Sequence, residues 1–190
     1  VVEKPTGEIS LGAGFGSSGG TIGAGIKESN FLGKGIKLNT DLSIATNTIK
    51  GTFMYEKPNF NYSDNSLLLS ATSTARNEIT IAGYKSSEIG FSVGTSFEQY
   101  ENFYITPRLS TTHETLTTTS SASANYKKQE GSYFDNYLNY TLDYDNRNKR
   151  YKPDDGFRNT FNQNLPLYSK NNEIVNSFET IKYQKFSDVV

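Results

Sequence analysis

The sequence contains no cysteine, no tryptophan, one histidine and one methionine among its 190 residues. Without cysteine, neither a disulfide framework nor a thiolate metal site can form. A single histidine and scattered carboxylates do not make a metal-ligand set, so we expect no metal and no other cofactor. The formal net charge of −1 differs from that of a typical nucleic-acid-binding domain, which carries a clustered basic patch, so we expect no nucleic-acid partner.

Long hydrophobic runs are absent as well. No stretch approaches the roughly 18 consecutive apolar residues that a transmembrane helix needs, and residues 1–7 lack the basic and apolar segments of a signal peptide. The mean hydropathy of −0.60 would suit a soluble protein. A membrane β-barrel has an equally low average, because only every second residue of its strands faces lipid. Only the period with which apolar and polar residues alternate can therefore distinguish a soluble protein from a membrane β-barrel.

Apolar and polar residues alternate with a period of two in several parts of the chain. In residues 36–44 the odd positions are polar, and the positions between them are apolar or threonine. Residues 89–97 and 134–144 alternate in the same way. Each run has about nine to eleven residues, enough to cross a bilayer as a tilted strand. Alternation predicts that Leu42 and Phe91 face lipid, whereas Asp41 and Ser92 face the interior.

Turn-forming residues separate these runs along the whole chain. Reading strands between the turns gives about ten, near residues 7–15, 20–31, 35–46, 48–57, 66–77, 86–97, 102–117, 132–146, 156–166 and 173–186. Compact connections alternate with longer ones, as they do at the two faces of an outer-membrane barrel. We therefore predict an all-β fold, an antiparallel up-and-down transmembrane β-barrel. The alternative, a soluble β-sandwich, has strands of about five or six residues, roughly half as long as these.

Two proline positions in the middle of the chain fit this pattern, and a third does not. Pro58 and Pro153 fall in predicted turns, where a missing N–H leaves no gap in a hydrogen-bonded ladder. Pro107 lies inside a predicted strand instead. It indicates a bulge or an unpaired edge at that point.

Three features could suggest a binding or catalytic site. Gly14-Phe-Gly16-Ser-Ser-Gly19 satisfies G-x-G-x-x-G, but a dinucleotide site needs a helix after the motif, and residues 21–26 continue as a strand, so we expect a hairpin loop. Nothing around His113 resembles a nucleophile elbow, so we predict that this histidine is a solvated residue near the outer end of its strand. We therefore expect that the protein is not an enzyme. A mixed-charge cluster over residues 145–158 could contact a periplasmic partner; the alternative is a solvated turn with weak internal ion pairs.

Four segments, taken in order, resemble the barrel of the BamA family. Residues 7–26 look like its opening hairpin, and Asn30-Phe-Leu-Gly33-Lys-Gly35 resembles its turn between the second and third strands. Glu56-Lys-Pro58-Asn-Phe60 is similar to the turn after the fourth strand. Asp145-Asn-Arg147-Asn and Tyr151-Lys-Pro153-Asp-Asp-Gly156 resemble the turn before the ninth strand. The family turn motifs are thus carried by Asn30, Gly33, Gly35, Pro58, Arg147, Pro153 and Gly156.

The resemblance implies a domain organisation. The family's barrel has sixteen strands, of which about ten are accounted for here. Its periplasmic POTRA domains and its long sixth extracellular loop are not found in this sequence. We therefore expect residues 1–6 to be a stub that links to absent POTRA domains, and residues 7–190 to be a partial outer-membrane β-barrel domain.

The resemblance also implies a function without covalent chemistry. In the family the first strand pairs weakly with the last and opens a lateral gate, and an incoming strand then adds to the exposed edge. In this sequence that edge would consist of Glu8, Ile9, Ser10, Leu11, Gly12, Ala13, Gly14 and Phe15. Interior glycines weaken such a strand, although they could instead relieve crowding at a barrel seam.

The expected protein is thus an insertion factor in the cell outer membrane of a Gram-negative-type bacterium, a multi-pass β-barrel. Its expected partners are unfolded outer-membrane proteins, membrane lipid and the accessory lipoproteins of an assembly complex. The alternative is a passive porin or a two-partner secretion pore, whose lumen would carry rings of charge. Lys37, Asp41, Asp135 and Asp143 are lumen candidates, but they form no obvious ring.

Overall fold

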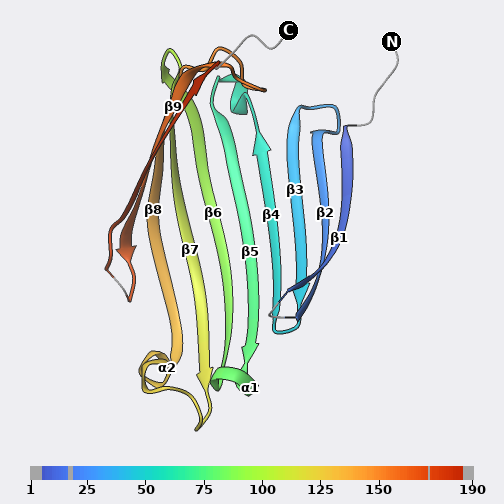
Figure 1. The fold of residues 1–190 in the computed structure, drawn as a ribbon. Coiled ribbons are helices and arrows are strands. Elements are labelled where there is room, and N and C mark those ends of the chain that lie inside the picture. Colours follow the sequence, from blue (N-terminus) through green and yellow to red (C-terminus); the bar gives the residue numbers. More distant parts are fainter. Residues whose placement is uncertain (1–5, 17–18, 171, 186–190) are drawn as a thin grey trace.

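The computed structural model describes residues 6–16, 19–170 and 172–185, and these form one strongly curved sheet of 10 strands (Figure 1). Each strand pairs antiparallel with its neighbours in sequence, from β1 to β10 in order. The strands are β1 (Gly7–Gly16), β2 (Gly19–Phe31), β3 (Ile36–Ala45), β4 (Thr48–Lys57), β5 (Ser66–Glu78), β6 (Tyr84–Tyr100), β7 (Phe103–Thr118), β8 (Gly131–Asp145), β9 (Asp155–Tyr168) and β10 (Val175–Gln184). The predicted all-β meander is therefore confirmed, and within these residues the sheet is not closed.

Alternation gives the sheet two chemically different faces. On the concave inner face, Ser92 is only 6% exposed and its hydroxyl lies 2.6 Å from that of Ser70. Its neighbour Phe91, on the outer face, is 51% exposed. Leu42 likewise lies exposed on the outer face, while Asp41 on the inner face accepts a hydrogen bond from Asn39. The two faces are therefore assigned as the alternation predicted.

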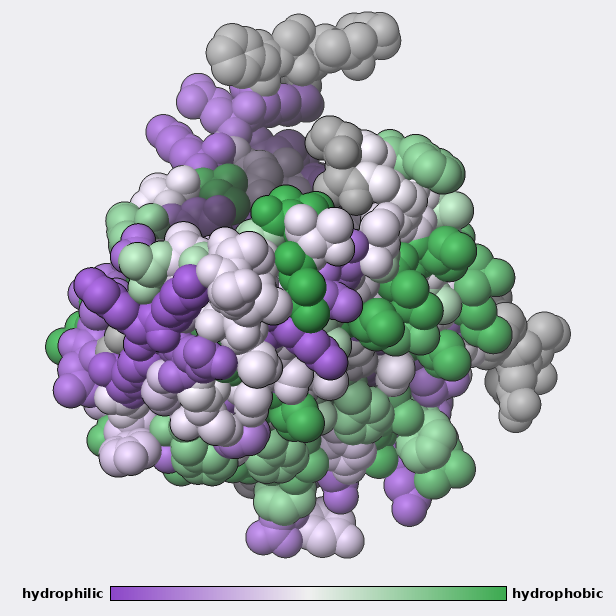
Figure 2. All heavy atoms as spheres, turned by 90° about the horizontal axis from the view of Figure 1, so that it is seen from below, coloured by the Kyte–Doolittle hydropathy of each residue, from purple (hydrophilic) through white to green (hydrophobic). Residues whose placement is uncertain are grey.

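The two ends of the sheet differ in their connections. At the end near Thr6 lie the turns at 32–35, 58–65, 101–102 and 146–154, with a short 3-10 helix, η1 (Phe60–Tyr62). At the opposite end lie the connections that contain α1 (Ile79–Ala82) and α2 (Ala124–Gln129). Figure 2 views this second end, with hydrophilic residues gathered on the α2 side and hydrophobic ones on the side of β1 to β3. Among the described residues, no helix has the length and apolarity to span a membrane.

Buried apolar side chains are few and mostly lie at the α1–α2 end. Of the described residues, Ile36, Tyr84, Leu116 and Ala122 are the buried hydrophobic ones. The ring of Tyr84 stacks on that of Tyr126 in α2, with centroids 4.2 Å apart. The loop of α2 is joined to that of α1 because Gly83 O accepts hydrogen bonds from Thr119 N (2.8 Å) and Thr119 Oγ1 (3.0 Å). The outer face leaves its large apolar residues uncovered, as expected where lipid is the solvent.

Pro107 interrupts the ladder without making a bulge. It pairs with Tyr140 of β8, but on the β6 side no pair is formed between Gly94–Arg108 and Phe97–Ile105. The register is the same before and after this gap, so the bulge we considered is wrong. β7 is also not an edge strand, because it pairs with both β6 and β8; the gap is local and lies on the β6 side alone. A proline has no N–H to donate, which accounts for the gap. Register shifts occur instead near residues 28–31, 98–100 and 136–137.

Candidate functional site: the edge of β1

β1 is the first edge of the sheet and is held by β2 alone. Its register with β2 runs unbroken from Gly7 opposite Glu28 to Gly16 opposite Gly19. Every residue of the strand is exposed; Leu11 is 82% exposed and Phe15 96%. Among the described residues, β1 makes one side-chain hydrogen bond, a long one from Ser10 Oγ to Gly25 O at 3.5 Å. The eight predicted edge residues thus form one continuous strand with an unpaired side.

Three of the four glycines of β1 are not explained by crowding against β2; the exception is Gly7, where a Cβ would lie 3.0 Å from Glu28 Oε2. A Cβ at Gly12, Gly14 or Gly16 would meet no described atom within 4 Å. Glycine there removes side-chain contact from a strand that has little of it and adds backbone entropy to the unfolded state. Glycine at these three positions therefore weakens β1, and no close packing against β2 requires it.

The opposite wall of the sheet is cross-linked by side chains. On the inner face Ser110 Oγ donates to Asn139 Oδ1, and Asn139 Nδ2 donates to Asn164 Oδ1, each at 2.7 Å. On the outer face Gln163 accepts from Tyr140 Oη (2.5 Å) and donates to Asn176 Oδ1 (2.6 Å). These side-chain hydrogen bonds link β7 to β8, β8 to β9 and β9 to β10, in addition to the backbone ladder. No local pattern in the sequence indicates them, because residues about 25 apart meet only when the register is known.

The turn at residues 30–35 is built around Asn30. Its Oδ1 accepts a hydrogen bond from Gly35 N at 2.6 Å, and its carbonyl oxygen accepts from Gly33 N at 2.9 Å. Gly33 and Gly35 have φ of 69° and 65°, the left-handed region that glycine tolerates best. A Cβ on Gly35 would lie 3.9 Å from Pro58, so the two turns at this end are neighbours. These motif residues shape the rim and are not part of the β1 edge.

The turn between β8 and β9 is held by ion pairs within itself. Arg147 makes two hydrogen bonds of 2.7 Å to the carboxylate of Asp145, and Lys149 lies 3.0 Å from Asp154. The amide of Asn148, with a smaller effect of Lys149, holds the pKa of Asp154 below its ordinary value. Gly156, at φ 97°, packs against the backbone of Asn146 with no room for a side chain, and Pro153 lies in the turn before it. These internal contacts fit the solvated-turn interpretation of the charge cluster; contact with a periplasmic partner stays a prediction.

The remaining sequence features are placed as follows. β2 follows the glycine-rich segment as a strand, so the G-x-G-x-x-G pattern lies on a hairpin whose tip, residues 17–18, falls outside the described residues. His113 is exposed on the outer face toward the α2 end, with Nε2 2.8 Å from Ser132 Oγ. Within the described ranges no carboxylate contacts His113, and no group of acidic or histidine side chains is arranged to hold a metal.

The predicted lumen charges all lie on the inner face but do not form a ring. Lys37 pairs with Glu56 at 2.8 Å, and Asp143 pairs with Arg158 at 2.8 Å. Asp41 is held by Asn39, and Asp135 accepts from the backbone N–H of Lys170 at 2.9 Å. The inner face is thus polar. Of the four predicted lumen charges, Lys37 and Asp143 form ion pairs with a neighbouring strand.

Comparison with known proteins assigns this architecture. Residues 30–189 match the sequence profile described as the Omp85 superfamily domain. The chain belongs to the Omp85 superfamily. Among solved structures, 62 chains match, including BamA from Haemophilus ducreyi in a crystal structure lacking POTRA domains 1-3, with 27% identity and a TM-score of 0.65. Comparison with curated protein sequences gave no match.

The Omp85 assignment confirms the BamA-type barrel predicted from the turn motifs and places the chain in an outer-membrane β-barrel. The match with the Haemophilus protein covers 87% of this chain and 35% of that one, so the present chain spans about a third of its length. The Omp85 match begins at Asn30, which leaves β1 outside it. Residues 1–5 of the predicted POTRA-linked stub lie outside the described residues.

Proposed function

We propose that this chain supplies part of a factor that inserts β-barrel proteins into the outer membrane of a Gram-negative-type bacterium, and that an incoming strand pairs with the edge of β1. The observation that carries the proposal is the structure of β1: an exposed edge strand with glycine-spaced, uncrowded positions and one weak side-chain hydrogen bond. Its unfolded outer-membrane substrates, and accessory lipoproteins that work with it, are the partners proposed.

Strand addition at β1 requires no covalent step and no cofactor. An incoming strand gains a ladder of main-chain hydrogen bonds, which is β-augmentation. An open edge in hydrocarbon is costly because each unpaired N–H and C=O lacks a partner. A weakly held first strand lowers the cost of exchanging its closing partner for a substrate strand, and glycines supply that weakness.

The side chains of β1 fit an edge that opens into lipid. Ile9, Leu11, Ala13 and Phe15 lie on the outer face, and Ser10, Gly12 and Gly14 lie on the inner face opposite Gly25, Gly23 and Thr21. An incoming strand that continues this alternation would place its apolar residues in lipid and its polar residues toward the lumen. The edge therefore favours strands with the period of outer-membrane barrels.

Site-specific cross-linking in the full-length protein tests this edge. Single cysteines at Ser10 or Gly12 should cross-link to nascent outer-membrane proteins during their assembly. A cysteine at Ser43 is the control, because β3 is paired on both sides, with β2 and β4. Equal cross-linking from all three positions, or none from Ser10 and Gly12, contradicts the gate.

Proline substitution gives a second test of the same edge. Leu11→Pro removes a backbone donor and should impair assembly of outer-membrane proteins, whereas Leu11→Ala keeps the N–H and should impair it far less. A disulfide that locks the first strand to the last should block growth until a reductant is added. Normal assembly by the locked protein would reject strand exchange at β1.

A passive pore is the second candidate, and the polar inner face favours it. A porin or secretion pore would show a large and steady conductance in planar bilayers, whereas an insertion factor would not. Such a conductance, together with normal growth of the locked protein, would replace the first proposal by the second.

A further inference from the structure

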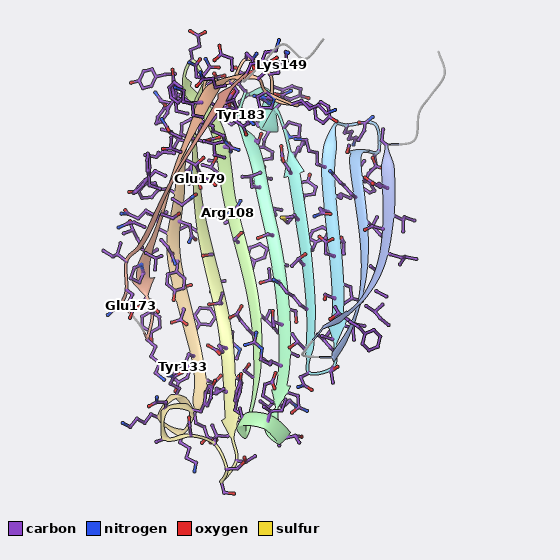
Figure 3. The ribbon with its side chains drawn as sticks, in the orientation of Figure 1. Arg108, Tyr133, Lys149, Glu173, Glu179 and Tyr183 are labelled. Atoms are coloured by element: carbon purple, nitrogen blue, oxygen red, sulfur yellow. The ribbon has the colours of Figure 1, made fainter. Side chains whose placement is uncertain are left out.

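Arg108 is a charged side chain on the inner face that makes no ion pair with any described residue, although a neighbouring hollow that it lines also has Glu28 and Glu56 in its wall. It is half-buried in β7 and lies away from both rims of the sheet (Figure 3). Its guanidinium makes no hydrogen bond or ion pair with residues 6–16, 19–170 or 172–185. By contrast Arg158, on the same face, makes bonds of 2.8 and 2.9 Å to Asp143. An arginine stays charged at all physiological pH values, so a half-buried one without an anion is unfavourable.

A hollow of about 410 Å³ lies beside Arg108 on the inner face. Its polar walls include Ser70, Ser92, Thr106, Ser110, Asn139 and Thr141, and none of its lining residues is Asp or Glu. Arg108 is the one charged residue of that lining. The hollow thus combines neutral hydrogen-bonding groups with one fixed positive charge.

The neutral neighbours already use one another as partners. Asn139 Oδ1 accepts from Ser110, the hydroxyls of Ser70 and Ser92 lie 2.6 Å apart, and Thr106 Oγ1 donates to Ser96 at 2.8 Å. Among the described residues, none of these groups accepts a hydrogen bond from the Arg108 guanidinium. A guanidinium presents five N–H donors in a planar fork.

Gly94 keeps the space beside Arg108 free. It is directly opposite Arg108 in β6, and a Cβ there would lie 3.1 Å from Arg108 Cβ and 2.7 Å from Pro107 O. A side chain at position 94 would have to displace the backbone next to the hollow. Glycine at this position, where φ is ordinary, is thus accounted for by the close approach of β7.

We propose that the hollow beside Arg108 binds a carboxylate. A carboxylate accepts two parallel hydrogen bonds from a guanidinium, which is the strong geometry for this donor. Glu88, Glu114 and Asp135 lie farther along the same inner face, and their negative charges repel a phosphate dianion more strongly than a monoanion. One positive charge at Arg108 therefore suits a monoanion better. The carboxylate comes either from an acidic side chain of the barrel wall that faces β7 across the lumen, or from an acidic residue of a polypeptide in the lumen.

Peptide binding to the full-length barrel in nanodiscs distinguishes the second source. The probes are two fluorescent nine-residue peptides that differ only in a central Glu or Gln. If the carboxylate comes from a polypeptide, the Glu peptide should bind about tenfold more tightly than the Gln peptide. Arg108→Gln should abolish that difference, whereas Lys50→Gln, which removes another cation of the inner face, should keep it.

Thermal unfolding of the same proteins tests the first source. If a wall carboxylate occupies the hollow, both peptides should bind alike and Arg108→Gln should lower the unfolding midpoint, with Arg108→Lys in between. The paired carboxylate has a lowered pKa, so its contribution is present at neutral pH and is lost as pH falls below about 4. The midpoint difference between wild type and Arg108→Gln should therefore shrink at acid pH, whereas a mere packing defect would not titrate.

The proposal is overturned if the peptides bind alike and the effect of Arg108→Gln on the midpoint is absent or independent of pH. None of these measurements involves the edge of β1. Failure at Arg108 therefore leaves the insertion proposal standing, and failure of the β1 cross-links leaves this one standing.

Discussion

At the scale of single residues, Gly83 shows how one position joins two loops. It has φ 73°, and a Cβ would lie 2.6 Å from Ala122 N in the loop of α2. Gly83→Ala should therefore destabilise the joined loops by about 1–3 kcal/mol. The measurement is the unfolding midpoint of the full-length protein, together with the rate of proteolysis within residues 119–130.

Gly33 is the matched control for Gly83. It has a similar φ of 69°, but a Cβ at this position would meet nothing within 4 Å. Gly33→Ala should therefore show only the cost of the left-handed backbone, about 1–2 kcal/mol, and no change of proteolysis in the α2 loop. Equal proteolysis in both variants would mean that Gly83 does not join the loops.

Leu42 and Ser43 test which face of the sheet meets lipid. Leu42 lies on the outer face and Ser43 on the inner face, next to each other in β3. Leu42→Arg in the intact barrel should cost about 2–4 kcal/mol near the bilayer midplane, because lipid does not solvate the charge. Ser43→Arg should cost much less, since a watery lumen can solvate it. Similar losses of folding free energy in the two variants would contradict the assignment of the faces.

At the scale of elements, the strands differ in how firmly they are held. Within the described part of the chain, β1 has one weak side-chain hydrogen bond, whereas side-chain hydrogen bonds on both faces join β8 to β9, and others join β9 to β10. Local opening is easiest where backbone bonds are exposed and few other contacts exist. In the full-length barrel, amide hydrogen exchange should therefore be faster in residues 7–16 than in residues 132–144. Equal protection of the two segments would mean that β1 is not a weak edge.

At the scale of the whole molecule, the sheet has two edges that membrane lipid would not tolerate. β1 and β10 each have one partner among the described strands, and they do not pair with each other. Residues 1–190 expressed alone should therefore give no compact, heat-modifiable monomer on gels, because unpaired N–H and C=O groups would be bare in hydrocarbon. A protease-resistant, monomeric, membrane-embedded species formed by this chain alone would contradict this expectation.

The predicted strands agree with the observed ones, and the differences lie mainly at the strand ends. β6 runs from Tyr84 to Tyr100, beyond the predicted 86–97, because its ends are paired with β5 and β7 although their alternation is weak. The segment before it, expected as a loop, contains the four-residue helix α1. Local sequence indicates these ends poorly, since pairing with a neighbour decides how far a strand continues.

The sequence by itself determined the strands, their order and their two faces, because period-two alternation and turn residues act locally and need no knowledge of distant partners. Resemblance of contiguous motifs to a known family predicted the rim turns and the first strand; the role of that strand as a gate stays a prediction. Only the tertiary structure decided which distant side chains meet: Asn139 with Asn164, Gly83 with Ala122, and Arg108 with a hollow that lacks an acid. Those contacts depend on register across several strands, and a register is a property of the assembled sheet.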